Sequence, residues 1–116
     1  MKPDLVARLV LELASEDLFG LWEILWAVRG KDPSVGKSVQ EAAVRETVRR
    51  LLRQGFVNLY RRTGVSSDET LVEADLIESI LDAATPWREP HVNEPAYLVG
   101  ATEKGKKAYL AMFADR

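Results

Sequence analysis

The segment "LFGLWEILWAV" (18–28) most strongly restricts how this chain can fold, because Glu23 is its only charged residue. In a helix, its apolar side chains would cover nearly every face, and such a helix must be covered by other elements on several sides. We expect a helix over 16–29, capped by Ser15-Glu16-Asp17 and ended by Gly30. This helix should lie at the centre of one core.

The same segment allows a second interpretation, in which its large aromatic side chains form a contact between subunits. The residues of this candidate interface are Phe19, Trp22 and Trp26. The length of 116 residues suits a single domain over 1–116 in either case, since a chain of that size buries roughly two-thirds of its unfolded surface.

Several kinds of site and location are disfavoured by composition. The chain has no cysteine, which excludes disulfides, thiolate zinc sites and cysteine nucleophiles. Asp4, Arg8 and Glu12 interrupt the first apolar stretch, unlike the core of a signal peptide. The longest run without a charge, Pro95 to Thr102, has eight residues, far fewer than the roughly 20 of a membrane span. We therefore expect a cytoplasmic protein without membrane contacts.

The stretch "GKDPSVGKS" (30–38) resembles a phosphate-binding loop, but its spacing is wrong. A Walker A loop has four residues between its first Gly and Gly-Lys-Ser and joins a strand to a helix, whereas five residues intervene here. Ser38-Val39-Gln40-Glu41 has the pattern of a capping box, in which Ser38 and Glu41 cap each other's backbone N–H groups. We expect a helix start here and no nucleotide or other cofactor.

Periodicity and turn residues predict the remaining elements and a mainly α fold with a small antiparallel β-hairpin, of the α+β class. Gly55 is a good residue to follow a helix end, and Ser66-Ser67-Asp68-Glu69 is a second capping signal. The expected helices cover 3–14, 16–29, 39–54, about 66–84 and 102–113, and the expected strands cover 56–62 and 96–101.

Charge is divided unevenly along the chain. The overall net charge is −2, yet residues 37–62 carry seven basic and two acidic groups, and residues 63–95 carry one and eight. The basic segment includes Arg45, Arg49 and Arg53 at i, i+4 and i+8, which places them in one row along a helix. A plainer interpretation is that Glu41 and Glu46 pair with arginines four residues later and support the helix.

The segments "VRRLLRQGFVNLYRR" (48–62) and "YLVGATEKGKKAYL" (97–110) resemble the winged helix-turn-helix family, as found in PadR-like and MarR-like regulators. The resemblance implies that 38–54 is the recognition helix and that the two strands form the wing. An acidic insertion over 63–95, with an extra helix, stands where the family has a tight hairpin tip.

By this resemblance, the expected function is that of a DNA-binding transcriptional regulator. The recognition helix would lie in the major groove of double-stranded DNA, which is about 12 Å wide, and neighbouring cations would hold the backbone. The candidate DNA-binding residues are Lys37, Arg45, Arg49, Arg50, Arg53, Arg61 and Arg62.

The alternative is a winged-helix module for protein interaction or dimerisation that does not bind DNA. The acidic helix 68–84 would then be a docking surface, or would lie against the arginine row of its own or a neighbouring chain. Regulators of this type commonly act as homodimers. The opposite charges of the two segments make such contacts electrostatically reasonable.

Enzymatic activity is not expected, and no catalytic or metal-binding residues are proposed. His91 is the only histidine, and a lone histidine in a loop is usually a surface or packing residue. Six acidic residues between 68 and 82 lack the spacing and turn glycine of a calcium loop. Trp87, in a Pro-rich loop, is expected to pack on the core as a lid.

Overall fold

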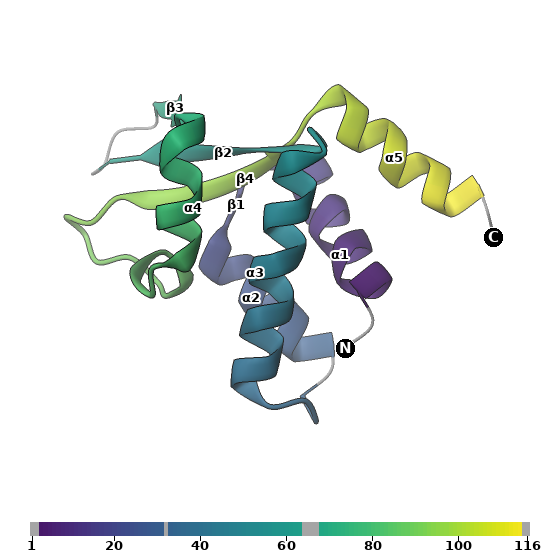
Figure 1. The fold of residues 1–116 in the computed structure, drawn as a ribbon, viewed down its shortest axis with the longest axis horizontal. Helices are drawn as coiled ribbons and strands as arrows, with labels where there is room; N and C mark the ends of the chain where they lie inside the picture. Colours follow the sequence, from purple (N-terminus) through teal and green to yellow (C-terminus); the bar gives the residue numbers. More distant parts are fainter. Residues whose placement is uncertain (1–2, 32, 64–67, 115–116) are drawn as a thin grey trace.

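The computed structural model describes residues 3–31, 33–63 and 68–114. These residues form an α+β fold with five α-helices, a 3-10 turn and a four-stranded antiparallel sheet (Figure 1). None of the helices described is long and apolar enough to cross a membrane. The elements are α1 (Pro3–Glu16), β1 (Phe19–Gly20), α2 (Leu21–Lys31), α3 (Lys37–Arg53), β2 (Val57–Arg62), β3 (Glu69–Leu71), α4 (Ala74–Asp82), η1 (Thr85–Trp87), β4 (Ala96–Ala101) and α5 (Glu103–Ala114).

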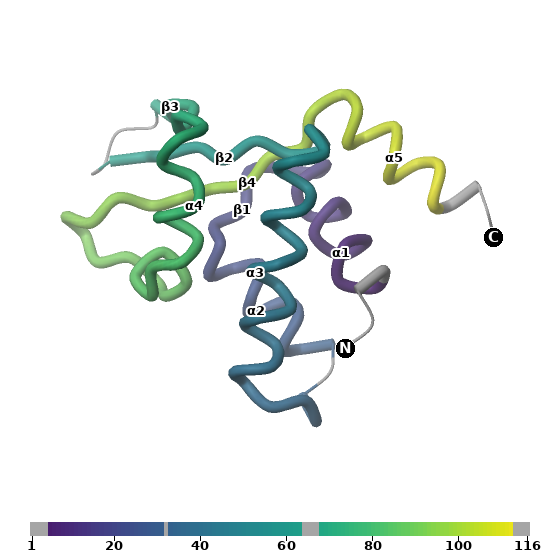
Figure 2. Tube along the Cα trace, viewed as in Figure 1, coloured from purple at the N-terminus to yellow at the C-terminus, as the bar shows by residue number. Residues whose placement is uncertain are grey.

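The core lies where α1, α2 and α3 pack on one another and against the sheet, and α5 runs beside α1 (Figure 2). Helices α1 and α3 each contribute one apolar side, as their helical spacing predicts. Helix α2 was expected to be covered on several sides, but it also buries one side and leaves Trp26 exposed. Leu52 of α3 is half-buried against this core. The buried apolar residues of this group include Val10 and Leu11 of α1, Leu21, Ile24, Leu25 and Val28 of α2, and Val44, Val48 and Leu51 of α3.

The predicted helix 16–29 is wrong at both ends. Helix α1 continues through Glu16, and β1 then pairs with β4. The N–H of Gly20 donates a hydrogen bond of 2.9 Å to the Glu23 carboxylate, so Ser15-Glu16-Asp17 is not the cap. A two-residue strand leaves no periodic signal, so the sequence pattern does not predict it. Gly30 lies inside α2, which ends at Lys31.

Helix α3 begins close to the predicted place but without the predicted capping box. Gly36 occupies the N-cap position without a side-chain hydrogen bond, and Ser38 lies exposed in the first turn. Helix α2, rather than a strand, precedes this segment, as expected. Gly55, with φ of +77°, follows the helix end in the left-handed conformation that favours glycine.

The two predicted strands pair as expected, since β2 and β4 are antiparallel from Val57↔Ala101 to Arg62↔Ala96. The predicted helix over 66–84 is wrong in its first part. Ser66 and Ser67 lie outside the described residues, and Glu69–Leu71 forms β3 against β2. The helix covers only Ala74–Asp82. The backbone of β2 offers a free edge, and pairing with it outweighs the local helical spacing.

The end of the insertion and the start of α5 both join the core. Trp87 is 3% exposed, which confirms the expected packing of this residue on the core. The Thr102 hydroxyl accepts a hydrogen bond from the N–H of Gly105 and donates one of 2.7 Å to the Gly55 carbonyl. A Cβ added at Gly105 would lie 1.9 Å from the Phe56 carbonyl oxygen, so only glycine allows this close approach.

Candidate functional site

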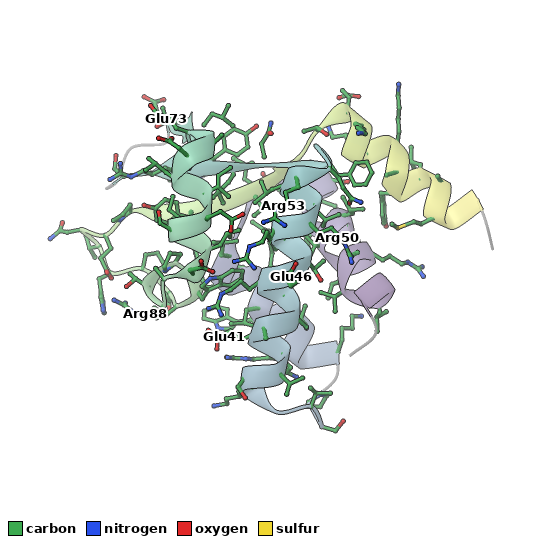
Figure 3. All side chains as sticks on the ribbon, in the orientation of Figure 1. Glu41, Glu46, Arg50, Arg53, Glu73 and Arg88 are labelled. Atoms are coloured by element: carbon green, nitrogen blue, oxygen red, sulfur yellow. The ribbon has the colours of Figure 1, made fainter. Side chains whose placement is uncertain are left out.

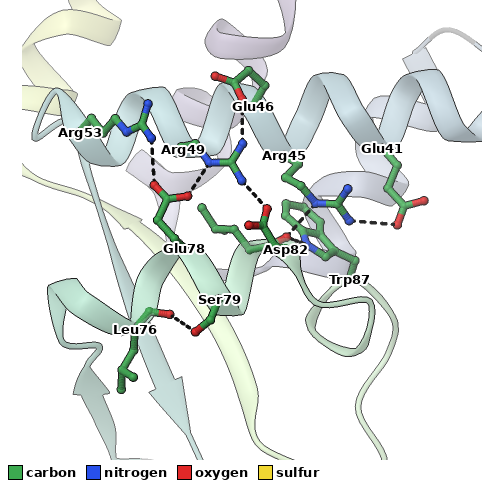
Figure 4. Close-up of polar contacts among 11 residues, drawn as sticks. Glu41, Arg45, Glu46, Arg49, Arg53, Leu76, Glu78, Ser79, Asp82 and Trp87 are labelled. Carbon is green, nitrogen blue, oxygen red and sulfur yellow. Dashed lines mark hydrogen bonds and ion pairs between the residues drawn. The ribbon is translucent and has the colours of Figure 1, made fainter.

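The arginine row predicted on α3 exists, and helix α4 of the insertion lies beside it (Figure 3). The row consists of Arg45, Arg49 and Arg53, and α4 turns Glu78 and Asp82 toward it (Figure 4). The geometry is thus the one in which the acidic helix lies against the arginines of its own chain.

Arg49 is the centre of this contact. Its guanidinium donates to three carboxylates: Nη1 to Glu46 at 2.8 Å, Nε to Glu78 at 2.8 Å and Nη2 to Asp82 at 2.6 Å. Its side chain is only 15% exposed. These hydrogen bonds, first that with Glu46 and then that with Glu78, raise the pKa of Arg49 above its ordinary value. Arg49 is therefore a fully charged group, and each of its three guanidinium nitrogens already donates to a carboxylate.

Glu78 bridges two arginines, since its second oxygen accepts from Nη2 of Arg53 at 3.0 Å. The hydrogen bond from Arg49 is the main cause that lowers the pKa of Glu78 below its ordinary value, and Arg53 adds to it. Arg53 remains 66% exposed, in contrast to Arg49. Only the far end of the row therefore faces solvent.

Arg45 holds the C-terminal end of α4. Its Nε donates a hydrogen bond of 2.7 Å to the Leu81 carbonyl, which also accepts one of 2.9 Å from the indole N–H of Trp87. The guanidinium lies 5.5 Å from the centre of the Trp87 ring, in cation–π range. A carbonyl at a helix C-terminus lacks a partner within the helix and attracts cations, so Arg45 stabilises this end of α4.

The other predicted DNA-binding residues lie elsewhere. Lys37, Arg50 and Arg61 make no side-chain ion pair or hydrogen bond within 3–31, 33–63 and 68–114. Arg50 lies on the side of α3 nearer to α1, away from α4 (Figure 3). Arg62 forms an ion pair with Glu69 of β3. The seven cationic residues predicted to bind DNA therefore fall into two sets. One set contacts residues of the segment 63–95, and the other has no such partner among the residues described and remains free to contact an anionic ligand.

The predicted aromatic interface is only partly accessible. Phe19 and Trp22 are half-buried, and the Trp22 ring covers Gly20 so closely that a Cβ there would lie 2.1 Å from it. Trp26 is 48% exposed on α2. The interpretation of 18–28 as core thus holds for one side of α2, and Trp26 is the member of the aromatic set best placed to meet a partner.

In the loop around His91, the Glu94 carboxylate is the common partner, and the His91 imidazole Nε2 lies 3.8 Å from it. The Glu94 carboxylate accepts from the His91 backbone N–H at 2.9 Å and from Arg88 at 3.0 and 3.1 Å, and these bonds lower the pKa of Glu94. No group of three or more metal-ligating side chains occurs within the described part of the chain.

Sequence reasoning did not identify the specific partners of the arginine row. Glu78 and Asp82 stand at i and i+4, the same spacing as the arginines, so the two helices can match charge for charge when they lie side by side. This matching spacing of opposite charges can be recognised in the sequence. The partners of Arg45 cannot, because the Leu81 carbonyl and the Trp87 ring carry no net charge.

Comparison of the chain with protein family models, with curated proteins and with solved structures gives no match.

Proposed function

We propose that the chain is a non-enzymatic, winged-helix-like DNA-binding protein of the transcriptional regulator type. The observation that carries this proposal is the placement of α3. This helix packs through one side on α1 and α2, is followed directly by β2, which pairs with β4, and keeps several cationic side chains outside the core. These side chains are Lys37 at the start of α3 and, near its end, Arg50 and Arg53, of which Arg53 lies on the α4 side.

The size of α3 suits a DNA groove. Its 17 residues span about 25 Å at 1.5 Å per residue, and the major groove admits one helix. Cations without an internal partner are the ones that can neutralise phosphates at no cost to an existing ion pair. Each such contact releases counterions, so it contributes roughly −0.9 to the slope of log affinity against log salt concentration.

The test is fluorescence anisotropy of a labelled mixed-sequence duplex at about 50 and 200 mM salt, where contacts with several phosphates change affinity by orders of magnitude. The variant Arg50→Ala/Arg53→Ala should bind more weakly and with a shallower salt slope. Its control is Lys106→Ala/Lys107→Ala, which removes the same charge from exposed positions on α5. The proposal is overturned if neither the wild type nor a chain with α4 neutralised at Glu78 and Asp82 binds at the lower salt.

A second candidate, the protein-interaction module, is favoured by the same contact that complicates DNA binding. Arg45 and Arg49 already bind α4, and Trp26 is exposed on α2. In this case the partner is a second copy of the chain.

Analytical ultracentrifugation without DNA should give twice the 13.0 kDa chain mass, and Trp26→Ala should give a monomer. A wild-type monomer at all concentrations would rule out this homodimer.

A further inference from the structure

We infer that α4 is a built-in competitor for DNA. The carboxylates of Glu78 and Asp82 occupy the places on the arginine row that phosphates would take, and Arg49 and Arg53 bind DNA only after α4 has moved away from α3. This inference rests on the proposed function, because it concerns the regulation of the same surface.

The chemistry of the contact is that of phosphate recognition. Arg49 directs Nε and Nη2 at two carboxylates from adjacent turns of α4, at 2.8 and 2.6 Å. Guanidinium groups bind carboxylate and phosphate oxygens with the same donor geometry. Two acidic side chains at i and i+4 therefore imitate two anionic groups on a polyanion. While they are in place, the Nε and Nη2 edge of Arg49 is already occupied by carboxylates.

Helix α4 also repels DNA from this side of α3. Glu78 and Asp82 are 50% and 64% exposed even though they are paired, and Glu73 and Asp75 add exposed negative charge near the N-terminal end of α4. A duplex approaching the arginine row would meet these carboxylates before it reached Arg49. Occupied donors and repulsion act in the same direction, so the structure represents a closed state of the surface.

The two ends of α4 are held differently. At the C-terminal end Leu81 is fully buried, and its carbonyl accepts from both Arg45 and Trp87. Toward the other end Leu76 is 49% exposed. Two open grooves of about 330 and 270 Å³ flank this half, one bordered by Ile77 and the other by Leu76. The N-terminal end is tied to the sheet through β3 and the Val72 N–H, which donates a hydrogen bond of 2.9 Å to the Leu59 carbonyl. Helix α4 can therefore swing outward about its C-terminal anchor once this short β3 pairing is released.

Glu78 is the contact that such a swing releases first. It lies at the middle of α4, farther from the anchored Leu81 than Asp82, which adjoins Leu81, and it bridges Arg49 and Arg53. Ion pairs between exposed partners are individually weak and weaken further with salt. A polyanion that offers several phosphates together can replace them.

The experiment compares two charge-matched double variants of the full chain in the same duplex assay. Glu78→Gln/Asp82→Asn removes the two carboxylates that contact the row, and Glu73→Gln/Asp75→Asn removes two that do not. At the lower salt concentration, the first should raise affinity about tenfold or more, since it removes the carboxylates that compete with phosphates for two arginines. The second should raise affinity by less than about threefold, through general charge alone. The gain should disappear when Arg49→Ala/Arg53→Ala is added.

Each outcome separates the inference from the function on which it rests. If the wild type binds and both double variants bind alike, the competitor role is overturned and the DNA-binding function remains. If no variant binds, the function fails, and the inference fails with it.

A second measurement needs no substitution. Amide hydrogen exchange in 74–82 should become faster when the duplex is added to the wild type, because α4 leaves α3. Unchanged or slower exchange in α4 at saturating DNA would contradict its displacement.

Discussion

The two sides of α3 both carry arginine, but within the residues described the arginine is paired with carboxylates on one side and not on the other. On the side facing α4, the Arg49 side chain is 15% exposed and contacts three carboxylates. On the side nearer α1, Arg50 has no side-chain partner in the described residues. Arg49 thus has a structural role, whereas its sequence neighbour Arg50 remains available to bind a partner. The net charge of a segment overstates what it can offer to DNA when another segment neutralises part of it.

Removing the anchor of the covered side should have the largest effect. Trp87→Ala deletes a side chain that is 3% exposed, donates to the Leu81 carbonyl and lies against Arg45. We expect a loss of about 3–5 kcal/mol in the free energy of unfolding, measured by urea denaturation. Val92→Ala, at a residue 79% exposed, is the control and should change little. A cost of Trp87→Ala below about 1 kcal/mol would mean that α4 is not anchored there.

The two ends of α4 can be compared directly with two leucines. Leu81→Ala should cost about 2–4 kcal/mol, since Leu81 is fully buried. Leu76→Ala should cost less than about 1 kcal/mol, because Leu76 is half exposed. Urea denaturation of both variants checks the difference. Equal costs would contradict a helix held mainly at its C-terminal end.

The two sides of α3 can be compared with two arginines. Arg45→Ala removes a charged hydrogen bond to the Leu81 carbonyl and a contact with Trp87, and we expect a loss of about 1–2 kcal/mol. Arg50→Ala should stay within about 0.5 kcal/mol of the wild type, as is usual for side chains without specific partners. If Arg50→Ala is the more costly of the two, the assignment of the sides is wrong.

The smallest effect should be a dependence on pH. The pKa of Glu78 lies below its ordinary value of 4.5 in the folded chain, so its charged form stabilises the fold. This stabilisation is fully present above pH 4.5 and is lost as pH falls through the lower folded-state pKa. The difference in urea midpoint between the wild type and Glu78→Gln should be constant near neutral pH and shrink in acid. A difference that grows in acid would reverse the assigned sign.

Long periodic elements were predictable from the sequence, and short ones were not. The helix after Lys37, the β2–β4 strands and the final helix have spacings repeated over many residues, so their local signal is strong. Strands β1 and β3 have two and three residues, and they exist because β4 and β2 offer hydrogen-bonding edges. Their conformation is decided by partners distant in the sequence, which no local pattern encodes.

The same distinction applies to the candidate site. The row of Arg45, Arg49 and Arg53 follows from helical geometry alone. The identity of its partners depends on where the insertion folds back, and this is fixed by burial of Leu81 and Trp87. The sequence suggested that Trp87 packs on the core, but not that this packing would bring Glu78 to Arg49.

The separation of β2 from β4 in the sequence also bears on how fast the chain folds. The 33 residues from Thr63 to Pro95 must be closed into a loop before these strands pair. By the logarithmic dependence of loop entropy on length, this costs about 2 kcal/mol more than closing a four-residue turn. Contacts between α1, α2 and α3 are nearer in sequence and should form earlier. Sheet closure, with the docking of α4, is therefore the expected late step of folding.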